Sequence, residues 1–234
     1  RNMPDLSYET IADGLTVCTS QLHRFGTDAV LLTEFSGYRQ KDRVCDFGTG
    51  CGIIPMLMQR TAPPREIYAV DIQKEAIQQM CLGIAKSETI CSVLYPICTD
   101  LKTLWDGAPL GQLDLVTCNP PYKAYQAGIE SQLTAQKIAR HEVLCSIYDI
   151  CRSAKRLLRF GGRLCICNRP ERLADCIDAM RQSGIEPKRL QFVAKAADAQ
   201  PWLFLLEGRS GGKPFLNVLP QRIVGDGSGV TTRI

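Results

Sequence analysis

Short apolar runs alternate with longer segments of helical periodicity from residue 43 to residue 182. Apolar residues at period two are typical of a strand, whereas recurrence every three or four residues is typical of a helix. Strands that alternate with helices assemble into a parallel sheet covered on both faces. We expect strands at 43–46, 66–70, 92–97, 113–118 and 163–167, and helices at 53–60, 74–86, 141–158 and 171–182. The alternation therefore predicts an α/β fold built on a parallel sheet.

The pattern changes toward the C-terminus. The strand-like runs at 189–194 and 202–207 are separated by too few residues for a crossover helix, so they should pair antiparallel. The helix at 141–158 has the clearest apolar face, and we expect Gly161 and Gly162 to cap its C-terminal end.

The length of 234 residues fits one large domain with appendages. We expect a single domain over residues 1–234, with an N-terminal segment at 1–42, a core at 43–207 and a glycine-rich tail at 208–234 that is loosely ordered at its end. No apolar run approaches the roughly 20 residues that a membrane helix needs. The first residues also lack the pattern of an export signal, so we expect a cytoplasmic protein with no membrane partner.

Twelve cysteines raise the question of disulfides or a metal site, but no two are spaced as Cys-x-x-Cys. This absence argues against a zinc ribbon and against a thioredoxin-type centre. The cysteines lie in apolar segments such as Leu164–Cys167, so we expect most of them to be small buried residues in a reducing compartment. His23 and His141 are the two histidines, and no metal is expected.

The net charge of +4 hides an asymmetry between the two halves of the chain. Residues 1–117 carry 10 Lys and Arg against 14 Asp and Glu, whereas residues 118–234 carry 18 against 10. A basic half suggests an anionic partner, with nucleic acid the first candidate, although a solvated surface would give the same composition.

A glycine-rich loop, Asp46–Gly52, follows the first expected strand and precedes the first expected helix. Glycine lets a backbone approach a ligand that side chains would block. The dinucleotide-binding fingerprint requires a glycine where this chain has Ile53, and the lysine of a phosphate-binding P-loop is missing. The loop therefore favours a nucleoside ligand that has no phosphate group to hold.

Three acidic residues stand at strand ends, in order along the chain. Asp46 ends the first strand and Asp100 follows the third, while Asp71 ends the second, 19 positions after Gly52. A carboxylate at Asp71 can accept hydrogen bonds from both ribose hydroxyls, and Asp100 could accept one from an adenine amine. Asp46 could instead cap a helix, and Asp100 could start the turn before Leu101. The three together favour a nucleoside-type cofactor.

The motif Asn119-Pro120-Pro121-Tyr122 comes directly after the expected strand at 113–118. With the glycine loop before it, the motif resembles the class I S-adenosylmethionine-dependent methyltransferases that modify planar nitrogens. The resemblance covers roughly residues 43–170. It implies that the Asn119 side-chain oxygen and the Pro120 carbonyl accept hydrogen bonds from an adenine amine, so that the nitrogen directs its lone pair at the methyl group. Pro121 restricts the backbone and holds the Pro120 carbonyl in place, and Tyr122 offers a ring on which the base can stack.

Within that class, the chain is most similar to the tRNA1(Val) adenine-N6-methyltransferase family, which modifies the adenine beside the anticodon. The match rests on Arg24–Leu32 and extends to Arg140–Glu142 and Gly211–Pro214. It implies a Rossmann-like fold with seven mostly parallel strands, a terminal antiparallel hairpin and helices on both faces. It also implies that segment 1–42 covers the cofactor, that S-adenosylmethionine is converted to S-adenosylhomocysteine, and that the substrate is tRNA.

The resemblance and the motifs together assign candidate site residues. The catalytic residues are expected to be Asn119, Pro120, Pro121 and Tyr122. The residues expected to bind the cofactor are Thr27, Asp28, Asp46, Phe47, Gly48, Thr49, Gly50, Gly52, Asp71, Ile72, Asp100, Leu101 and Asn119. The candidate RNA contacts are Lys123, Lys137, Arg140 and Lys155. The polar stretch 123–139 is either a lid over the site or a plain surface loop, and the protein is expected to be a monomer.

Two other functions remain open. N5-glutamine methyltransferases that act on release factors use the same Asn-Pro-Pro-Tyr motif, because it suits any planar nitrogen. That family typically has a helical domain before the glycine loop, where this chain has only about forty residues. A catalytically silent RNA-binding subunit could also use the fold, but the intact Asn119 and Gly48–Gly50 argue against it.

Overall fold

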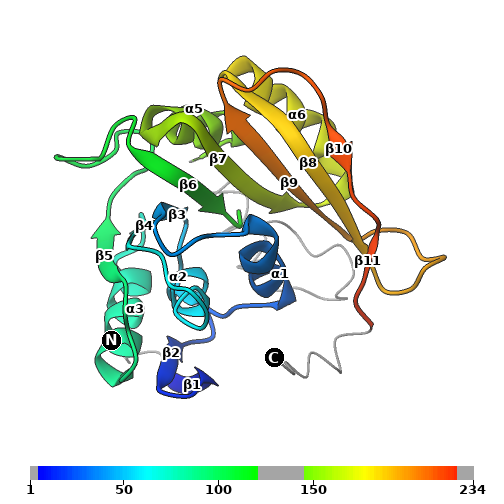
Figure 1. The fold of residues 1–234 in the computed structure, drawn as a ribbon. Coiled ribbons are helices and arrows are strands. Elements are labelled where there is room, and N and C mark those ends of the chain that lie inside the picture. The colour runs from blue at the N-terminus through cyan, green and yellow to red at the C-terminus, as the bar shows by residue number, and fades with distance from the viewer. Residues whose placement is uncertain (1–4, 121–144, 226–234) are drawn as a thin grey trace.

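The computed structural model describes residues 5–120 and 145–225, which form a sheet with helices on both faces (Figure 1). Its long strands lie in the order β5-β4-β3-β6-β7-β9-β8. These strands are β3 (Arg43–Phe47), β4 (Glu66–Asp71), β5 (Val93–Cys98), β6 (Leu113–Cys118), β7 (Leu158–Asn168), β8 (Ile185–Ala194) and β9 (Leu203–Ser210). The strands from β5 to β7 are parallel, and β9 pairs antiparallel with both β7 and β8. The expected fold class, with its mostly parallel sheet and terminal antiparallel pair, is confirmed.

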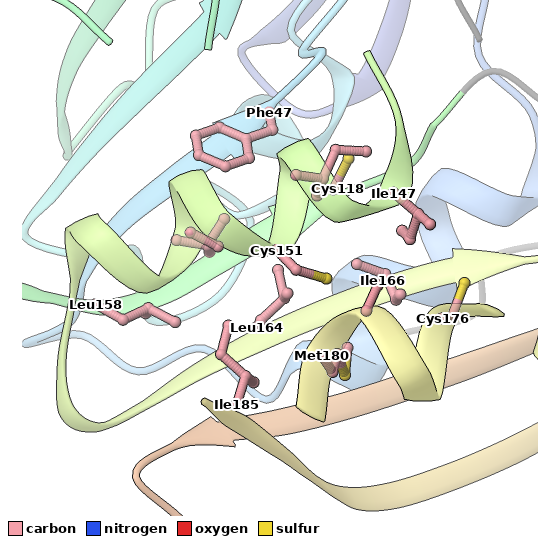
Figure 2. Close-up of a cluster of buried hydrophobic side chains, with 14 of the residues drawn as sticks. Phe47, Cys118, Ile147, Cys151, Leu158, Leu164, Ile166, Cys176, Met180 and Ile185 are labelled. Carbon is pink, nitrogen blue, oxygen red and sulfur yellow. The ribbon is translucent and has the colours of Figure 1, made fainter. Parts of the chain in front are cut away.

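Each face of the sheet is covered by its own group of helices (Figure 1). The helices are α1 (Thr27–Ser36), α2 (Ile53–Leu57) and α3 (Lys74–Lys86) on one face, and α5 (Ile147–Leu157) and α6 (Leu173–Gln182) on the other, with a 3-10 turn η1 (Pro170–Arg172) before α6. Successive residues of a strand point to opposite faces, so each central strand contributes to both cores. In β7, Leu164 and Ile166 join the core beneath α5 and α6 (Figure 2). Cys165 and Cys167 join the core beneath α1 and α2.

All twelve cysteines lie within the described ranges, none forms a disulfide, and eight are buried. The expectation that most of them are small buried residues is therefore confirmed. No helix within residues 5–120 and 145–225 has both the length and the apolar character to cross a membrane. The same ranges contain no group of three or more His, Cys, Asp or Glu side chains that could hold a metal ion.

Helix α5 begins later than the sequence predicts. Ser146 is its N-cap and forms a capping box, in which the Ser146 side chain accepts from the Asp149 backbone N–H and the Asp149 carboxylate accepts from the Ser146 N–H. The expected start at residue 141 is therefore wrong, although residues 141–144 themselves lie outside the described ranges.

The expected glycine cap at the end of α5 is also wrong. Leu158 is already extended, with φ −70° and ψ 134°, and it begins β7. Gly161 does have a positive φ of 75°, but it lies in β7, where the register with β6 shifts between Leu158 and Arg163. The chain therefore leaves the helix at Leu158 to pair with β6, and the helix ends before a glycine cap can form.

The N-terminal elements are not among those expected. Two short strands, β1 (Ser7–Ala12) and β2 (Leu15–Thr19), form a hairpin apart from the main sheet. Helix α3 packs closely on β2 because Gly83 has no side chain, and a Cβ there would lie 3.0 Å from the Thr16 carbonyl oxygen.

The described part of the tail follows the outer edge of the sheet. Two short strands, β10 (Asn217–Val218) and β11 (Arg222–Ile223), pair parallel with β8 and bring the sheet to nine strands. The sequence pattern gives no sign of them, because two residues are too few to show periodicity. The loose end that we expect falls on residues 226–234, which lie outside the described part.

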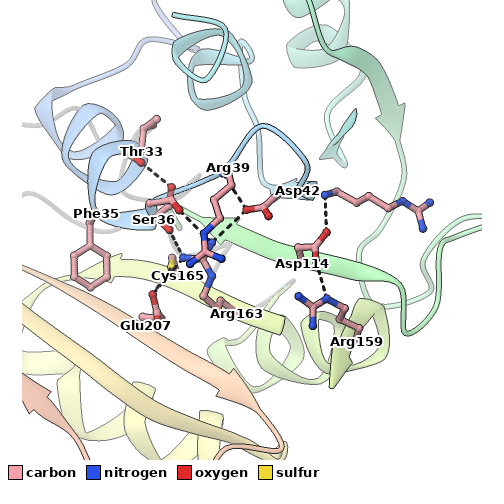
Figure 3. Close-up of polar contacts among 12 residues, drawn as sticks. Thr33, Phe35, Ser36, Arg39, Asp42, Asp114, Arg159, Arg163, Cys165 and Glu207 are labelled. Carbon is pink, nitrogen blue, oxygen red and sulfur yellow. Dashed lines mark hydrogen bonds and ion pairs between the residues drawn. The ribbon is translucent and has the colours of Figure 1, made fainter. Parts of the chain in front are cut away.

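Helix α1 is anchored to the sheet through the carbonyl groups of its last turn (Figure 3). Arg163 donates a hydrogen bond to the Ser36 carbonyl, and Arg189 Nη2 donates to the Phe35 carbonyl at 2.8 Å. Glu207 is only 2% exposed and accepts from Arg189 at 2.6 and 3.1 Å, with Arg163 Nη1 at 3.5 Å. Cations are favoured at a helix C-terminus, and α1 has no basic residue in its own last turn. Strand residues therefore supply these cations, and this fixes where α1 lies.

Candidate active site

The carboxyl ends of β3, β4 and β6 meet at one edge of the sheet, because β3 lies between the other two and is parallel to both. Phe47, the last residue of β3, is level with Val70 in β4 and with Cys118 in β6. The glycine loop, Asp71 and Asn119 follow these three positions directly. The two sequence motifs therefore come together at this edge, as the parallel arrangement predicts.

The glycine loop leaves open space on one side and packs tightly on the other. Gly48, Gly50 and Gly52 all have positive φ values, of 64°, 56° and 81°. A Cβ at Gly48 or Gly50 would meet nothing within 4 Å, whereas a Cβ at Gly52 would lie 2.5 Å from Met80 Cγ. The first two glycines therefore keep room for a ligand, and Gly52 allows α3 to approach.

Asp46 is buried beneath this loop, with 2% of its surface exposed. Burial is the main reason that its pKa rises from 3.8 to about 7; the charge of Asp71 adds to the rise, while a 2.6 Å hydrogen bond from Thr117 Oγ1 opposes it. The Thr49 hydroxyl is close enough to lower this pKa, yet it stays outside hydrogen-bond geometry. Thr49 Oγ1 is therefore a buried polar atom with no partner among the described residues. The N-cap of α2 is Gly52, so the alternative that Asp46 caps this helix is wrong.

Asp71 is held rigidly at the end of β4 and is 7% exposed. Its Oδ2 accepts from the Gly50 backbone N–H and its Oδ1 from the Gln73 backbone N–H, both at 2.9 Å. Each carboxylate oxygen can still accept a second hydrogen bond. Ile72 beside it is a large apolar side chain that is 47% exposed. A fixed acceptor next to an exposed apolar surface is compatible with the ribose and base of a nucleoside.

Asp100 takes part in the turn that follows β5. Its Oδ1 accepts from the Lys102 backbone N–H at 2.9 Å, its Oδ2 lies 3.6 Å from Lys102 Nζ, and its carbonyl accepts from the N–H groups of Thr103 and Leu104. The turn-initiating alternative for Asp100 is thus realised. Its contact with an adenine amine stays a prediction, as does that of the half-buried Leu101.

Asn119 is held from two sides by residues far away in sequence. Its side-chain Nδ2 donates to Asp28 Oδ2 at 3.0 Å, and its Oδ1 accepts from the thiol of Cys167 at 3.1 Å. Asp28 lies in the first turn of α1, next to Thr27, and its Oδ1 accepts from the Ala29 backbone N–H at 2.9 Å. The sequence interpretation assigns Asp28 to the cofactor, so its contact with Asn119 is a new finding.

Cys167 is missing from the expected site residues. The strand register of the structure brings it to the site, because Ile166 in β7 pairs with Cys118, which places Cys167 level with Asn119. A buried cysteine in a strand has no local feature that separates it from the other core cysteines.

Some expected site residues lie elsewhere or outside the described part. The Phe47 side chain is fully buried in the core beneath α5 (Figure 2), so only its backbone faces the loop. Lys155 Nζ donates to Ser210 Oγ at 2.8 Å near the start of β7. This contact lies at the amino ends of the parallel strands, whereas Asn119 lies at their carboxyl ends. Pro120 is half-buried after Asn119. The residues outside the described ranges are Pro121, Tyr122, Lys123, Lys137 and Arg140, together with the loop 123–139 and Arg140–Glu142.

Solved structures share this fold. A predicted O-methyltransferase from Agrobacterium tumefaciens is similar with a TM-score of 0.63 and 18% identity, over 84% of this chain and 86% of the other. The TYW2 protein of M. jannaschii in complex with AdoMet (S-adenosylmethionine) is similar with a TM-score of 0.54 and 11% identity, over 89% and 87%. The chain therefore has the fold of the class I S-adenosylmethionine-dependent methyltransferases, with a glycine loop after β3 and an acidic residue ending β4.

Sequence comparisons identify the family to which the chain belongs. A family model described as the methyltransferase small domain matches residues 23–183. The tRNA1(Val) (adenine(37)-N6)-methyltransferase of Parabacteroides distasonis is 30% identical over 185 residues, which are 79% of this chain and 76% of that protein. Across eight relatives with this same name, the matched share of the relative ranges from 57% to 76%. This chain belongs to the methyltransferase small domain family, and within it to the tRNA1(Val) (adenine(37)-N6)-methyltransferases.

Proposed function

We propose that this chain transfers a methyl group from S-adenosylmethionine to N6 of an adenine in tRNA, at the adenine beside the anticodon of tRNA1(Val). The observation that carries the proposal is the fixed Asn119 side chain beside the glycine loop. The names of the relatives support both the acceptor atom and the RNA.

The residues around the loop fit this cofactor. Gly48 and Gly50 leave space for close approach, and the unpartnered Thr49 hydroxyl offers a hydrogen bond. Asp71 would accept hydrogen bonds from the ribose hydroxyls through its free lone pairs. Asp46 lies beneath the loop, where the positive charge of the cofactor's methionine end would favour its ionised carboxylate. When bound, S-adenosylmethionine supplies an electrophilic methyl group on its sulfonium.

The chain's own residues orient the acceptor amine. Asn119 Oδ1 and the Pro120 carbonyl accept hydrogen bonds from its two N–H groups. These hydrogen bonds favour a pyramidal nitrogen whose lone pair is free to attack the methyl group. An adenine amine becomes acidic once methylated and can release its proton to water, so no protein base is required. Catalysis then comes mainly from positioning. Pro121 and Tyr122 complete the motif, with the ring stacking on the base.

The substrate assignment also fits the charge of the chain. A tRNA is anionic, and residues 118–234 carry the excess of Lys and Arg. An adenine in an anticodon loop is unpaired, so little energy is needed to extrude it. We further propose that the chain acts in the cytoplasm as a monomer and that residues 1–234 form one domain, with 1–42 over the cofactor.

The test is methyl transfer to total tRNA from cells that lack this modification, followed by nucleoside analysis. Wild type should form N6-methyladenosine, and Asn119→Ala should be at least about a hundredfold slower, because a positioned polar contact supplies roughly 3 kcal/mol. Asn217→Ala is the matched control, since Asn217 is exposed on β10. Methylated protein with unmodified RNA would refute the proposal in favour of a glutamine acceptor. Absence of S-adenosylmethionine binding in calorimetry would favour the silent RNA-binding subunit.

A further inference from the structure

The two ends of the Asn119 carboxamide are nearly equal in shape but opposite in hydrogen bonding. Oδ1 accepts, whereas the Nδ2 group only donates. The amine of the acceptor base also donates, so it can bind Asn119 only if Oδ1 faces it. A rotation of the carboxamide by half a turn would replace this acceptor with a second donor and would repel the substrate amine.

The contacts on Asn119 discriminate between these two orientations. The Asp28 carboxylate can only accept, and Asn119 Nδ2 donates to its Oδ2 at 3.0 Å. The Cys167 thiol donates to Asn119 Oδ1 at 3.1 Å. In the rotated carboxamide, Oδ1 would face the carboxylate of Asp28 and repel it. We infer that Asp28 and Cys167 are positioning residues that fix which end of the Asn119 carboxamide faces the acceptor nitrogen. This inference rests on the proposed function.

Both partners are themselves held in place. Asp28 accepts from the Ala29 N–H at 2.9 Å in the first turn of α1, where the helix dipole favours a carboxylate. The far end of α1 is fixed by Arg163 and Arg189. Cys167 is fully buried within β7. Burial, with the charge of Asp28 adding to it, raises the pKa of the Cys167 thiol well above its ordinary value, so the thiol keeps its proton at neutral pH.

The contact with Asp28 also strengthens Asn119 as an acceptor. A carboxylate on Nδ2 draws positive charge to that end of the amide and leaves more negative charge on Oδ1, as in other chains of hydrogen bonds. Oδ1 has two lone pairs, so the thiol occupies one and leaves the other for the substrate amine. The contacts should therefore raise the turnover rate and leave the affinity for S-adenosylmethionine unchanged.

The kinetic test compares kcat, KM for tRNA and the S-adenosylmethionine Kd in a set of variants. Cys167→Ala should lower kcat about tenfold and Asp28→Ala about a hundredfold, following the strength of neutral and charge-assisted hydrogen bonds, with the Kd unchanged. Cys167→Ser keeps a donor and should restore kcat to within about threefold of wild type. Cys151→Ala is the matched control, because Cys151 is equally buried but lies in α5, in the other core.

A structural role and a positioning role differ in one further measurement. In an Asn119→Ala background, Cys167→Ala and Asp28→Ala should cause no additional loss of kcat, because they act through Asn119. An additional loss equal to that in wild type would overturn the inference. So would a Cys167→Ala variant with wild-type kcat, or an Asp28→Ala variant that loses cofactor affinity and keeps kcat.

A spectroscopic readout separates this inference from the proposed function. In protein labelled with 15N-asparagine, the two side-chain proton signals of Asn119, assigned by their loss in Asn119→Ala, should shift or broaden in Asp28→Ala and in Cys167→Ala but not in Cys151→Ala. If these signals respond and wild type methylates no RNA, the proposed function fails and the positioning of Asn119 stands. If the signals are unchanged in both variants, the positioning is refuted whatever the enzyme methylates.

Discussion

Replacing Glu207 with glutamine would remove a carboxylate that pairs with both anchoring arginines of α1. Glu207 is 2% exposed and accepts two hydrogen bonds from Arg189, while Arg163 lies 3.5 Å away with a side chain that is 12% exposed. Removing one partner of a buried ion pair typically costs about 3–5 kcal/mol, because the remaining charge stays buried and uncompensated. The cost should be smaller here, because Arg163 also pairs with Asp42 at 3.3 Å and the Arg189 side chain is 34% exposed. Gln keeps the size of the side chain, so this cost is electrostatic and not a packing defect.

The expected loss can be measured by urea unfolding and by thermal unfolding. We expect Glu207→Gln to lower the free energy of unfolding by about 2 kcal/mol and the melting temperature by roughly 4–8 °C, given about 2–4 °C per kcal/mol for a chain of this size. Glu34→Gln is the matched control. Glu34 pairs with Arg222 at the surface, with side chains 43% and 37% exposed, and such pairs contribute less than about 1 kcal/mol. If both variants lose the same small amount, the anchoring of α1 by buried charge is refuted.

Three further predictions concern single positions. Gly52→Ala places a Cβ 2.5 Å from Met80 Cγ at a φ of 81°, so it should lower the free energy of unfolding by about 2–3 kcal/mol. Met80→Ala in the same chain should restore part of this stability. An unchanged free energy of unfolding in Gly52→Ala, measured by urea unfolding, would contradict the close packing. The pKa of Asp46 is about 7 in the folded chain and 3.8 as its ordinary value, so the folded state binds the proton more tightly and wild-type stability should fall as pH rises from about 4 to about 7. Asp46→Asn should lack this part of the decline, and parallel curves of stability against pH for the two proteins would show that burial does not govern this group. Ser146→Ala removes the N-cap of α5 and should cost about 1 kcal/mol in urea unfolding, a result that an unchanged midpoint would contradict.

The parts of the site that the sequence predicts are those that strand ends determine. The glycine loop, Asp71 and Asn119 each follow a strand directly, and parallel strands bring their carboxyl ends to one edge whatever else the chain does. Local pattern and one topological rule are sufficient for this result. The same reasoning predicts the antiparallel pairing of β8 with β9, because a short connection leaves no other choice.

The contacts that sequence pattern does not predict join residues far apart in the chain. Cys167 meets Asn119 across 48 positions, and Arg163 meets Ser36 across 127. No period or spacing specifies such pairs, since they depend on how helix and sheet pack together. The end of α5 is a further case, because the local signal of Gly161 is overridden when residues 158–168 pair with neighbouring strands.

The two short strands after Ser210 have a consequence for how separate molecules behave. They close the outer edge of β8, where the Leu219 N–H donates to the Leu190 carbonyl at 2.8 Å and the Val224 N–H to the Ala194 carbonyl at 2.9 Å. A chain cut before residue 217 would lose the partly buried Leu219 and Val224 but would retain the buried residues of both cores and the glycine loop, and it would present that edge to solvent. Open strand edges template association with other chains, so the shortened protein should aggregate while still correctly folded. The stretch 217–224 thus contributes to solubility more than to the fold itself.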